Sequence, residues 1–153
     1  MVLKIGDKAP RFSLPTDSGE ILSLNELRGQ RVVLYFYPKN MTPGCTSEAV
    51  DFRDYTKDFN NAGALIIGVS KETVVRHKNF KTKYNLNFTL ISDEKGTLCE
   101  AYGVWKKKKL YGREFMGIVR TTFLIDSFGI VQKIWPKVKV KGHAEEVLAA
   151  IQS

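Results

Sequence analysis

The stretch that decides the fold is Arg31 to Cys45, "RVVLYFYPKNMTPGC". It opens with a continuous β-branched and aromatic run, which is typical of a strand buried on both faces of a partly parallel sheet, and Pro38 ends that run. From Cys45, apolar residues recur every three or four positions until Gly63, which predicts an amphipathic helix with a glycine stop. The run "ALIIGVS", Ala64 to Ser70, predicts a second buried strand.

These pieces predict a β-α-β unit with parallel strands and a right-handed crossover. Upstream, "FSLPTDSGEILSL" alternates in hydrophobicity around the turn Asp17 to Gly19, which predicts an N-terminal β-hairpin extension. The elements expected after the unit are a helix over Glu72 to Tyr84, a strand over Phe88 to Ser92, a helix over Glu94 to Tyr102, a hairpin of Thr121 to Asp126 with Ile130 to Trp135, and a helix over His143 to Ile151. Together they predict an α/β protein of thioredoxin-like fold, with a central mixed β-sheet flanked by helices.

The chain has 153 residues and no Pro-, Gly- or Ser-rich linker, so we expect one domain over residues 1–153. The N-terminal stretch "MVLKIGDKAPRFSLP" lacks the apolar core of a signal peptide, and no window has the ~18 apolar residues of a membrane span. We therefore expect a soluble cytoplasmic protein without a membrane partner. Its cysteines and histidines stand at no metal-ligand spacing, so the sequence predicts no metal site.

The net charge of +8 and the four lysines Lys106 to Lys109 make an acidic partner such as nucleic acid worth considering. Beside the turn-like "LYGRE", such a run is more typical of a solvated loop. The sequence lacks the interleaved aromatic and arginine residues of a nucleic-acid platform, so nucleic acid is not expected as a partner.

The Cys45 thiol is expected in the first turn of its helix. Unpaired backbone N–H groups there point toward the sulfur, and this position lowers the pKa of a cysteine and favours the nucleophilic thiolate. A C-x-x-C redox pair needs a second cysteine at position 42, but Thr42 stands there, with a hydroxyl that suits a small substrate with two oxygens. The alternatives are that Cys45 is a small buried hydrophobe, and that Thr42 and Pro43 only form the turn into the helix.

Pro38, Thr42 and Cys45 spell P-x-x-x-T-x-x-C, which resembles the active-site signature of peroxiredoxins. The longer match "YFYPKNMTPGCTSEA" is similar to the PrxQ or bacterioferritin comigratory protein subgroup, and further similarity covers nearly the whole chain. The resemblance implies a thiol peroxidase that reduces hydrogen peroxide and organic hydroperoxides. It also implies a monomer that needs no metal, haem, flavin or other cofactor.

The resemblance further implies that Cys45 is the peroxidatic cysteine, which attacks a peroxide oxygen and becomes a sulfenic acid. Thr42 would hydrogen-bond the peroxide, and Pro38 would shield the sulfur. Arg120, in "GIVRTTF", matches the active-site arginine, whose cationic fork stabilises the thiolate and the leaving oxygen. From the residues alone, Arg120 could equally be a surface arginine at a strand end.

Supporting residues are expected in the same helical turn, Gly44 and Glu48 among them. Glu48 lies on nearly the same helix face as Cys45 and either pairs with an arginine or is a solvated first-turn glutamate. His77 and His143 have no cysteine or carboxylate partner at useful spacing, so surface or capping roles are expected for both.

The resolving cysteine of many PrxQ sequences is missing, because its position is occupied by Val50. Cys99 is the remaining candidate, but Leu98, Cys99, Tyr102 and Val104 form an apolar cluster that favours a packing role. The sequence therefore favours a 1-Cys mechanism, with the sulfenic acid reduced by thioredoxin, glutaredoxin or a small thiol. The alternatives are a peroxide-responsive redox sensor and a basic thioredoxin-fold binding module without turnover.

Overall fold

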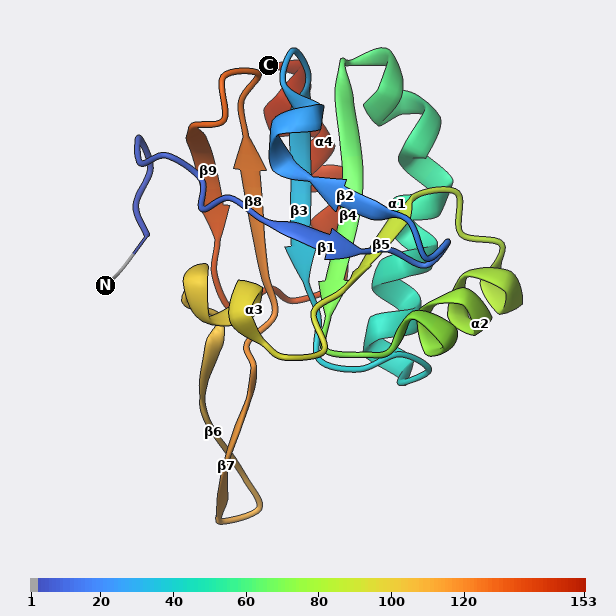
Figure 1. Cartoon of the computed structure of the whole chain (residues 1–153), viewed down its shortest axis with the longest axis vertical. Helices are drawn as coiled ribbons and strands as arrows, with labels where there is room; N and C mark the ends of the chain where they lie inside the picture. The colour runs from blue at the N-terminus through green and yellow to red at the C-terminus, as the bar shows by residue number, and fades with distance from the viewer. Residues whose placement is uncertain (1–2) are drawn as a thin grey trace.

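A five-stranded mixed sheet forms the centre of the molecule (Figure 1). The sheet has the order β5-β4-β3-β8-β9, with β3 at Arg31–Phe36, β4 at Ala64–Ser70, β5 at Thr89–Ser92, β8 at Thr121–Ile125 and β9 at Val131–Trp135. Strands β3, β4 and β5 are parallel, whereas β8 runs antiparallel to both β3 and β9. The structure is a computed structural model that describes residues 3–153, so the first two residues of the N-terminal stretch and of the expected domain lie outside the described residues.

The predicted β-α-β unit is confirmed as β3, α1 and β4, where α1 spans Pro43–Asn61. The helix begins two residues before Cys45, because extended Thr42 is its N-cap and proline fits the first helical position. Its C-terminal end is followed by Gly63 at φ +77°, a left-handed conformation that favours glycine. The thiol is thereby fixed at the end of the sheet where β3 finishes.

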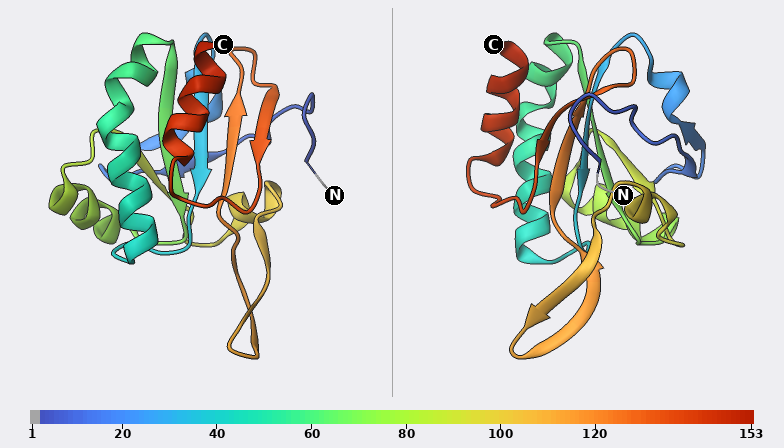
Figure 2. Two further views of the ribbon diagram at one scale, coloured as in Figure 1. Left: turned by 180° about the vertical axis from the view of Figure 1, so that it is seen from behind. Right: turned by 90° about the vertical axis from the view of Figure 1, so that its left-hand side faces the viewer.

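Strand β3 is buried on both faces, as its uninterrupted apolar sequence predicts. Val33 and Tyr35 pack on the face covered by α1 and by α4, His143–Gln152, which lie on one side of the sheet in Figure 2. Val32 and Leu34 pack on the opposite face, under the N-terminal segment, the 3-10 helix η1 at Leu24–Leu27, and α3 at Thr97–Ala101. Because strand side chains alternate, the sheet divides the interior into two separate apolar clusters.

The smaller elements also follow the predictions, with shifted boundaries. Strands β1, Ser13–Pro15, and β2, Ile21–Ser23, form the N-terminal hairpin, and β8 pairs with β9. Helix α2, Val74–Tyr84, begins after Thr73, whose hydroxyl accepts the Arg76 N–H. Across the described part of the chain, no helix has both the length and the apolar composition that a bilayer crossing needs.

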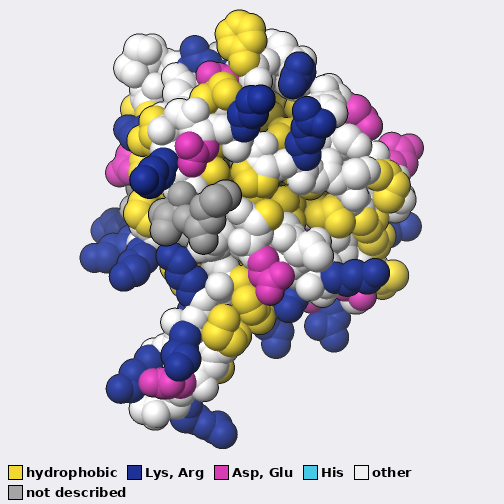
Figure 3. Space-filling view, turned by 60° about the vertical axis from the view of Figure 1, so that its left-hand side comes forward, with side chains coloured by type: hydrophobic (Ala, Val, Ile, Leu, Met, Phe, Trp, Pro, Cys, Tyr) yellow, Lys and Arg dark blue, Asp and Glu magenta, His cyan; other side chains and the backbone are white. Residues whose placement is uncertain are grey.

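The prediction that Lys106 to Lys109 form a loop is wrong. They belong to β6, Trp105–Leu110, which pairs with β7, Arg113–Ile118, through the turn at Tyr111 and Gly112. Both turn residues have positive φ angles, 51° and 77°, as a tight hairpin turn requires. The hairpin projects from the body, and Figure 3 shows lysine and arginine side chains along it. A lysine run carries no alternation, so its strand depends on cross-strand pairing that the local pattern does not reveal.

We expect Gly68→Ala to destabilise the fold by about 1–3 kcal/mol, because an added Cβ would lie 2.9 Å from both Leu90 Cδ2 and Tyr35 Cζ. Urea unfolding followed by circular dichroism measures the change. Gly44→Ala is the control, since its Cβ would meet nothing nearer than 3.4 Å. Equal unfolding midpoints for the two variants would contradict this packing constraint.

Candidate active site

Cys45 is the third residue of α1, and its side chain is buried against the end of β3. Thr42 is the N-cap, and its carbonyl accepts the Thr46 N–H, which leaves the preceding N–H groups of the first turn without helical partners. The N-terminal end of a helix favours negative charge. Cys45 therefore lies at the positive end of the helix dipole.

Arg120 lies next to this thiol although the two residues are 75 positions apart. Its Nη2 donates a hydrogen bond to Cys45 Sγ at 3.3 Å. Arg120 directly precedes β8, and the β8 register pairs Thr121 with Phe36, the last residue of β3. The antiparallel pairing of β8 with β3 therefore brings the start of β8 to the end of the sheet where α1 begins.

Glu48 binds the other nitrogen of the same guanidinium, with Arg120 Nη1 donating to Glu48 Oε1 at 2.6 Å. The alternative of a solvated glutamate is wrong, because Glu48 is only 1% exposed. Burial raises the pKa of Glu48 to about 7, although the charge of Arg120 opposes that shift. Burial also works against the charge of Arg120, but Glu48 and Cys45 outweigh it, so the pKa of Arg120 is raised. One guanidinium thus bridges a buried thiol and a buried carboxyl.

The other predicted site residues lie on the segment that leads from β3 into α1. Thr42 is half-buried, and its Oγ1 donates to the Lys39 carbonyl at 2.9 Å, which leaves the lone pairs of the hydroxyl free to accept. Half-buried Pro38 lies two residues after the end of β3. Gly44 lies beside Arg120, and an added Cβ there would lie 3.4 Å from Nη2, an ordinary contact distance. Among these residues, direct side-chain contact is made by Arg120 with Cys45 and Glu48.

Cys99 lies on the opposite face of the sheet from this arrangement. It is fully buried on α3 with Leu98, Tyr102 and Val104, as the apolar spacing predicted, in the cluster on the opposite face of the sheet from Cys45. Burial raises the pKa of the Cys99 thiol, and Asp93 raises it further. Both cysteines are free thiols, separated by the sheet.

The surface or capping roles expected for His77 and His143 are wrong, because both imidazoles are buried. His143 Nε2 lies 2.8 Å from Thr122 Oγ1, and burial lowers its pKa to about 4. His77 contacts Asn40, which lies in the loop that leads to Cys45 and which the sequence patterns did not reveal. The signal for His77 was its spacing from Phe80, three positions on, which places it on the buried face of α2.

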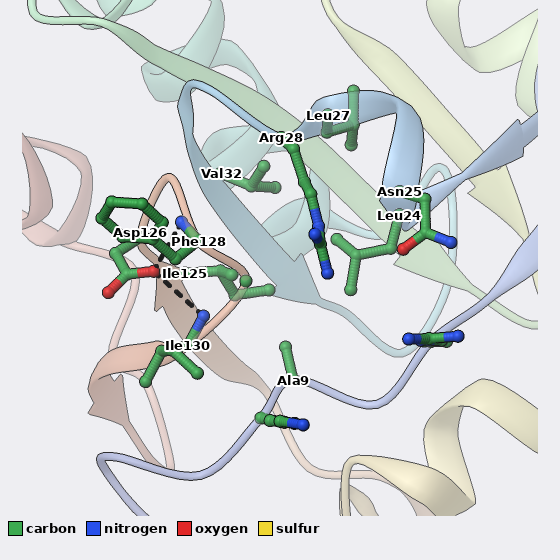
Figure 4. Close-up of a pocket in the computed structure, with 13 residues that line it drawn as sticks. Ala9, Leu24, Asn25, Leu27, Arg28, Val32, Ile125, Asp126, Phe128 and Ile130 are labelled. Atoms are coloured by element: carbon green, nitrogen blue, oxygen red, sulfur yellow. Dashed lines mark hydrogen bonds between the residues drawn. The ribbon is translucent and has the colours of Figure 1, made fainter.

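A separate pocket of about 80 Å³ lies at the other end of the sheet (Figure 4). Val32 and Ile125 contribute to its floor, and Arg28 points into it. Asp126 Oδ1 accepts the backbone N–H groups of Phe128 and Ile130. The described residues that line it include no cysteine or histidine, and residues 3–153 contain no cluster suited to a metal ion.

Comparison with known proteins now identifies the family. The model of the AhpC/TSA family matches residues 5–134. The chain belongs to the AhpC/TSA family. A peroxiredoxin bcp from Coxiella burnetii is 53% identical over 151 residues, covering 99% of this chain and all of the relative. The peroxiredoxin Bcp of Bacillus subtilis is 51% identical over 152 residues, covering 99% of this chain and 97% of that protein.

Solved structures of the family have the same fold. A PrxQ mutant from Xylella fastidiosa superposes with a TM-score of 0.94 at 36% identity, covering 99% of this chain and 97% of that one. The bacterioferritin comigratory protein of Xanthomonas campestris gives a TM-score of 0.89 at 42% identity, covering 99% and 96%. The predicted thioredoxin-like fold and the resemblance to the PrxQ group are both confirmed.

The raised pKa of Glu48 predicts a specific pH dependence of stability. The folded value of about 7 lies above the ordinary 4.5, so the folded state keeps a proton that the unfolded chain loses. The stability linked to this proton is complete below pH 4.5 and is lost as the pH rises through about 7. Relative to Glu48→Gln, which cannot ionise, the wild type should lose up to about 3 kcal/mol of unfolding free energy over this range.

Urea unfolding of both proteins at several pH values measures this difference. Glu94→Gln, which removes a solvent-exposed carboxyl, is the control. A wild-type minus Glu48→Gln difference that stays constant between pH 4.5 and 8 would show that Glu48 does not titrate in this way.

Proposed function

We propose that this AhpC/TSA family member is a thiol peroxidase whose reacting atom is Cys45 Sγ. The observation that supports the proposal is the hydrogen bond from Arg120 Nη2 to this sulfur, at the N-terminal turn of α1. A guanidinium and a helix N-terminus both stabilise a thiolate, the nucleophilic form of cysteine. The substrates are hydrogen peroxide and organic hydroperoxides, the class that the peroxiredoxin relatives indicate.

In the first step, the Cys45 thiolate attacks the terminal peroxide oxygen, so that an S–O bond forms as the O–O bond breaks. The sulfur is oxidised to a sulfenic acid and the peroxide is reduced. The displaced hydroxide or alkoxide takes up a proton and leaves as water or an alcohol. Arg120 stabilises the negative charge as it moves from sulfur to the leaving oxygen, because its fork of N–H donors already points at the reaction centre.

The neighbouring residues have supporting roles in this proposal. Glu48 holds the guanidinium through its 2.6 Å hydrogen bond and so fixes the orientation of the fork. Thr42 Oγ1 accepts a hydrogen bond from the O–H of the peroxide, since its own O–H is already donated to the Lys39 carbonyl. Pro38 limits access of water to the sulfur, and Gly44 leaves space beside Arg120.

The sulfenic acid is reduced by an external thiol, in a 1-Cys cycle. A thiolate of thioredoxin, glutaredoxin or a small molecule attacks the Cys45 sulfur, a mixed disulfide forms, and water is released; a second thiol then frees Cys45. Burial of Cys99 on the far face of the sheet, and its raised pKa, support this proposal over an internal disulfide. A reducing compartment such as the cytoplasm suits the cycle.

Cys45→Ser should abolish peroxide consumption, whereas Cys99→Ser should keep most of it. The measurement is steady-state peroxide consumption with thioredoxin, glutaredoxin or dithiothreitol as reductant, with circular dichroism as a control for folding. Loss of activity in Cys99→Ser with an intact fold would contradict the 1-Cys cycle. Oxidation of Cys45 without turnover with any of these thiols would contradict the peroxidase and favour a redox sensor.

Arg120→Lys should lower kcat/KM for peroxide by about 10²-fold, because lysine keeps the charge but cannot bridge the sulfur and Glu48 at once. Arg113→Lys is the matched control, since Arg113 is exposed on the β6–β7 hairpin. Equal kcat/KM values for the two variants would mean that a positive charge at position 120 is sufficient for the reaction with peroxide, without the two-pronged hydrogen bonding of the guanidinium.

A further inference from the structure

Three buried side chains, Tyr37, Asn40 and His77, form a hydrogen-bonded group that holds the loop between β3 and α1. Tyr37 Oη donates to Asn40 Oδ1 at 2.6 Å, and Asn40 Nδ2 lies 3.1 Å from His77 Nδ1. His77 Nε2 in turn lies 2.9 Å from the carbonyl oxygen of Ile91. Asn40, Tyr37 and His77 are all buried, so the loop is joined through side chains to both α2 and β5.

The protons in this group can be assigned from the partners. The Ile91 carbonyl can only accept, so His77 Nε2 carries a hydrogen and the neutral ring presents Nδ1 as an acceptor. Nδ1 then accepts the Asn40 Nδ2–H, while the Asn40 carbonyl accepts the Tyr37 O–H. Burial lowers the pKa of His77, against the opposing charges of Glu72 and Asp17, and so favours this neutral form. Each donor therefore faces an acceptor.

The loop between β3 and α1 depends on these hydrogen bonds because its backbone conformation is unfavourable. Met41 has φ +66°, a left-handed conformation that a residue with a side chain adopts only when its surroundings impose it. Its side chain is 44% exposed and contributes little packing. A cavity of about 260 Å³ adjoins the loop and is lined by Lys39, Asn40, Met41, Glu72, Arg76 and Asn79. The loop is open toward this cavity, and the buried hydrogen bonds of Asn40 join it to the body of the protein.

We propose that His77 is a positioning residue for the Cys45 reaction: through Asn40, its neutral imidazole holds the loop that sets Thr42 at the N-cap of α1. This inference rests on the proposed peroxidase function. Asn40 is two residues from Thr42, and the Thr42 carbonyl begins the helix by accepting the Thr46 N–H. Without the acceptor at His77, Met41 relaxes toward an ordinary φ angle and the loop moves into the adjoining cavity. Thr42 then leaves its position near the first turn that carries Cys45.

A first test compares two variants, each of which removes one buried tyrosine hydroxyl. Tyr35 lies in β3, and Tyr37 directly follows the strand. Tyr37→Phe removes the donor to Asn40, and we expect kcat/KM for peroxide to fall by about tenfold. Tyr35→Phe is the matched control, because the Tyr35 hydroxyl is buried without a hydrogen-bond partner among the described residues, and its ring lies 5.5 Å from that of Tyr37. We expect Tyr35→Phe to leave the peroxide rate unchanged.

A second test separates the acceptor of His77 from its bulk. His77→Asn keeps an acceptor near the place of Nδ1, whereas His77→Leu has a similar shape and no acceptor. We expect the Leu variant to lose about tenfold or more in kcat/KM for peroxide, and the Asn variant to recover most of it. Amide hydrogen exchange should rise at residues 39–42 in His77→Leu and Tyr37→Phe but not in Tyr35→Phe.

The outcomes distinguish this inference from the proposed function. Equal kcat/KM values for Tyr37→Phe and Tyr35→Phe, or no recovery in His77→Asn with the fold intact, would overturn the positioning role of His77 while wild-type turnover still supports the peroxidase. If His77→Leu fails to fold, Tyr37→Phe decides, because Tyr37 Oη contacts both Asn40 and His77 Nδ1, at 2.6 and 3.3 Å, and the variant keeps the ring and its packing. Absence of peroxide turnover in the wild type itself would overturn the peroxidase proposal.

Discussion

The whole arrangement depends on one guanidinium that is held between a thiol and a carboxyl, both buried. A buried charge is stable only when it is paired and hydrogen-bonded, and Arg120 meets this condition through Cys45 Sγ and Glu48 Oε1. The pairing fixes the direction of the N–H donors before any substrate arrives. In the proposed reaction, this arrangement stabilises the negative charge on the sulfur that nucleophilic attack requires.

The sheet imposes the second constraint. Because β8 pairs antiparallel with β3, the residue before β8 is delivered to the end of β3, where α1 begins. Because β3 is buried on both faces, the same sheet separates Cys45 from Cys99. One topology thus gathers the groups that surround the first thiol and keeps the second thiol apart from them. The loop between β3 and α1 adjoins a cavity, and Asn40 ties it to α2 through His77.

Local sequence patterns were sufficient for the β-α-β unit and for the place of Cys45 in the first helical turn, since both depend on residues close in the chain. Arg120 was found only through the family resemblance, because its contact with Cys45 spans 75 positions and no local pattern encodes it. The β6–β7 hairpin escaped prediction because lysines carry no strand signal. The burial of His77 was not predicted, because its sequence signal is its position on the buried face of α2 and not a chemical partner nearby in the chain.

The most direct measurement is to treat the protein with one equivalent of peroxide in the presence of dimedone, which traps sulfenic acids, and to locate the label by peptide mass spectrometry. The account predicts a single label on Cys45, an unmodified Cys99 thiol and no disulfide within the chain. A disulfide between Cys45 and Cys99, or a label on Cys99 with Cys45 unchanged, would contradict it.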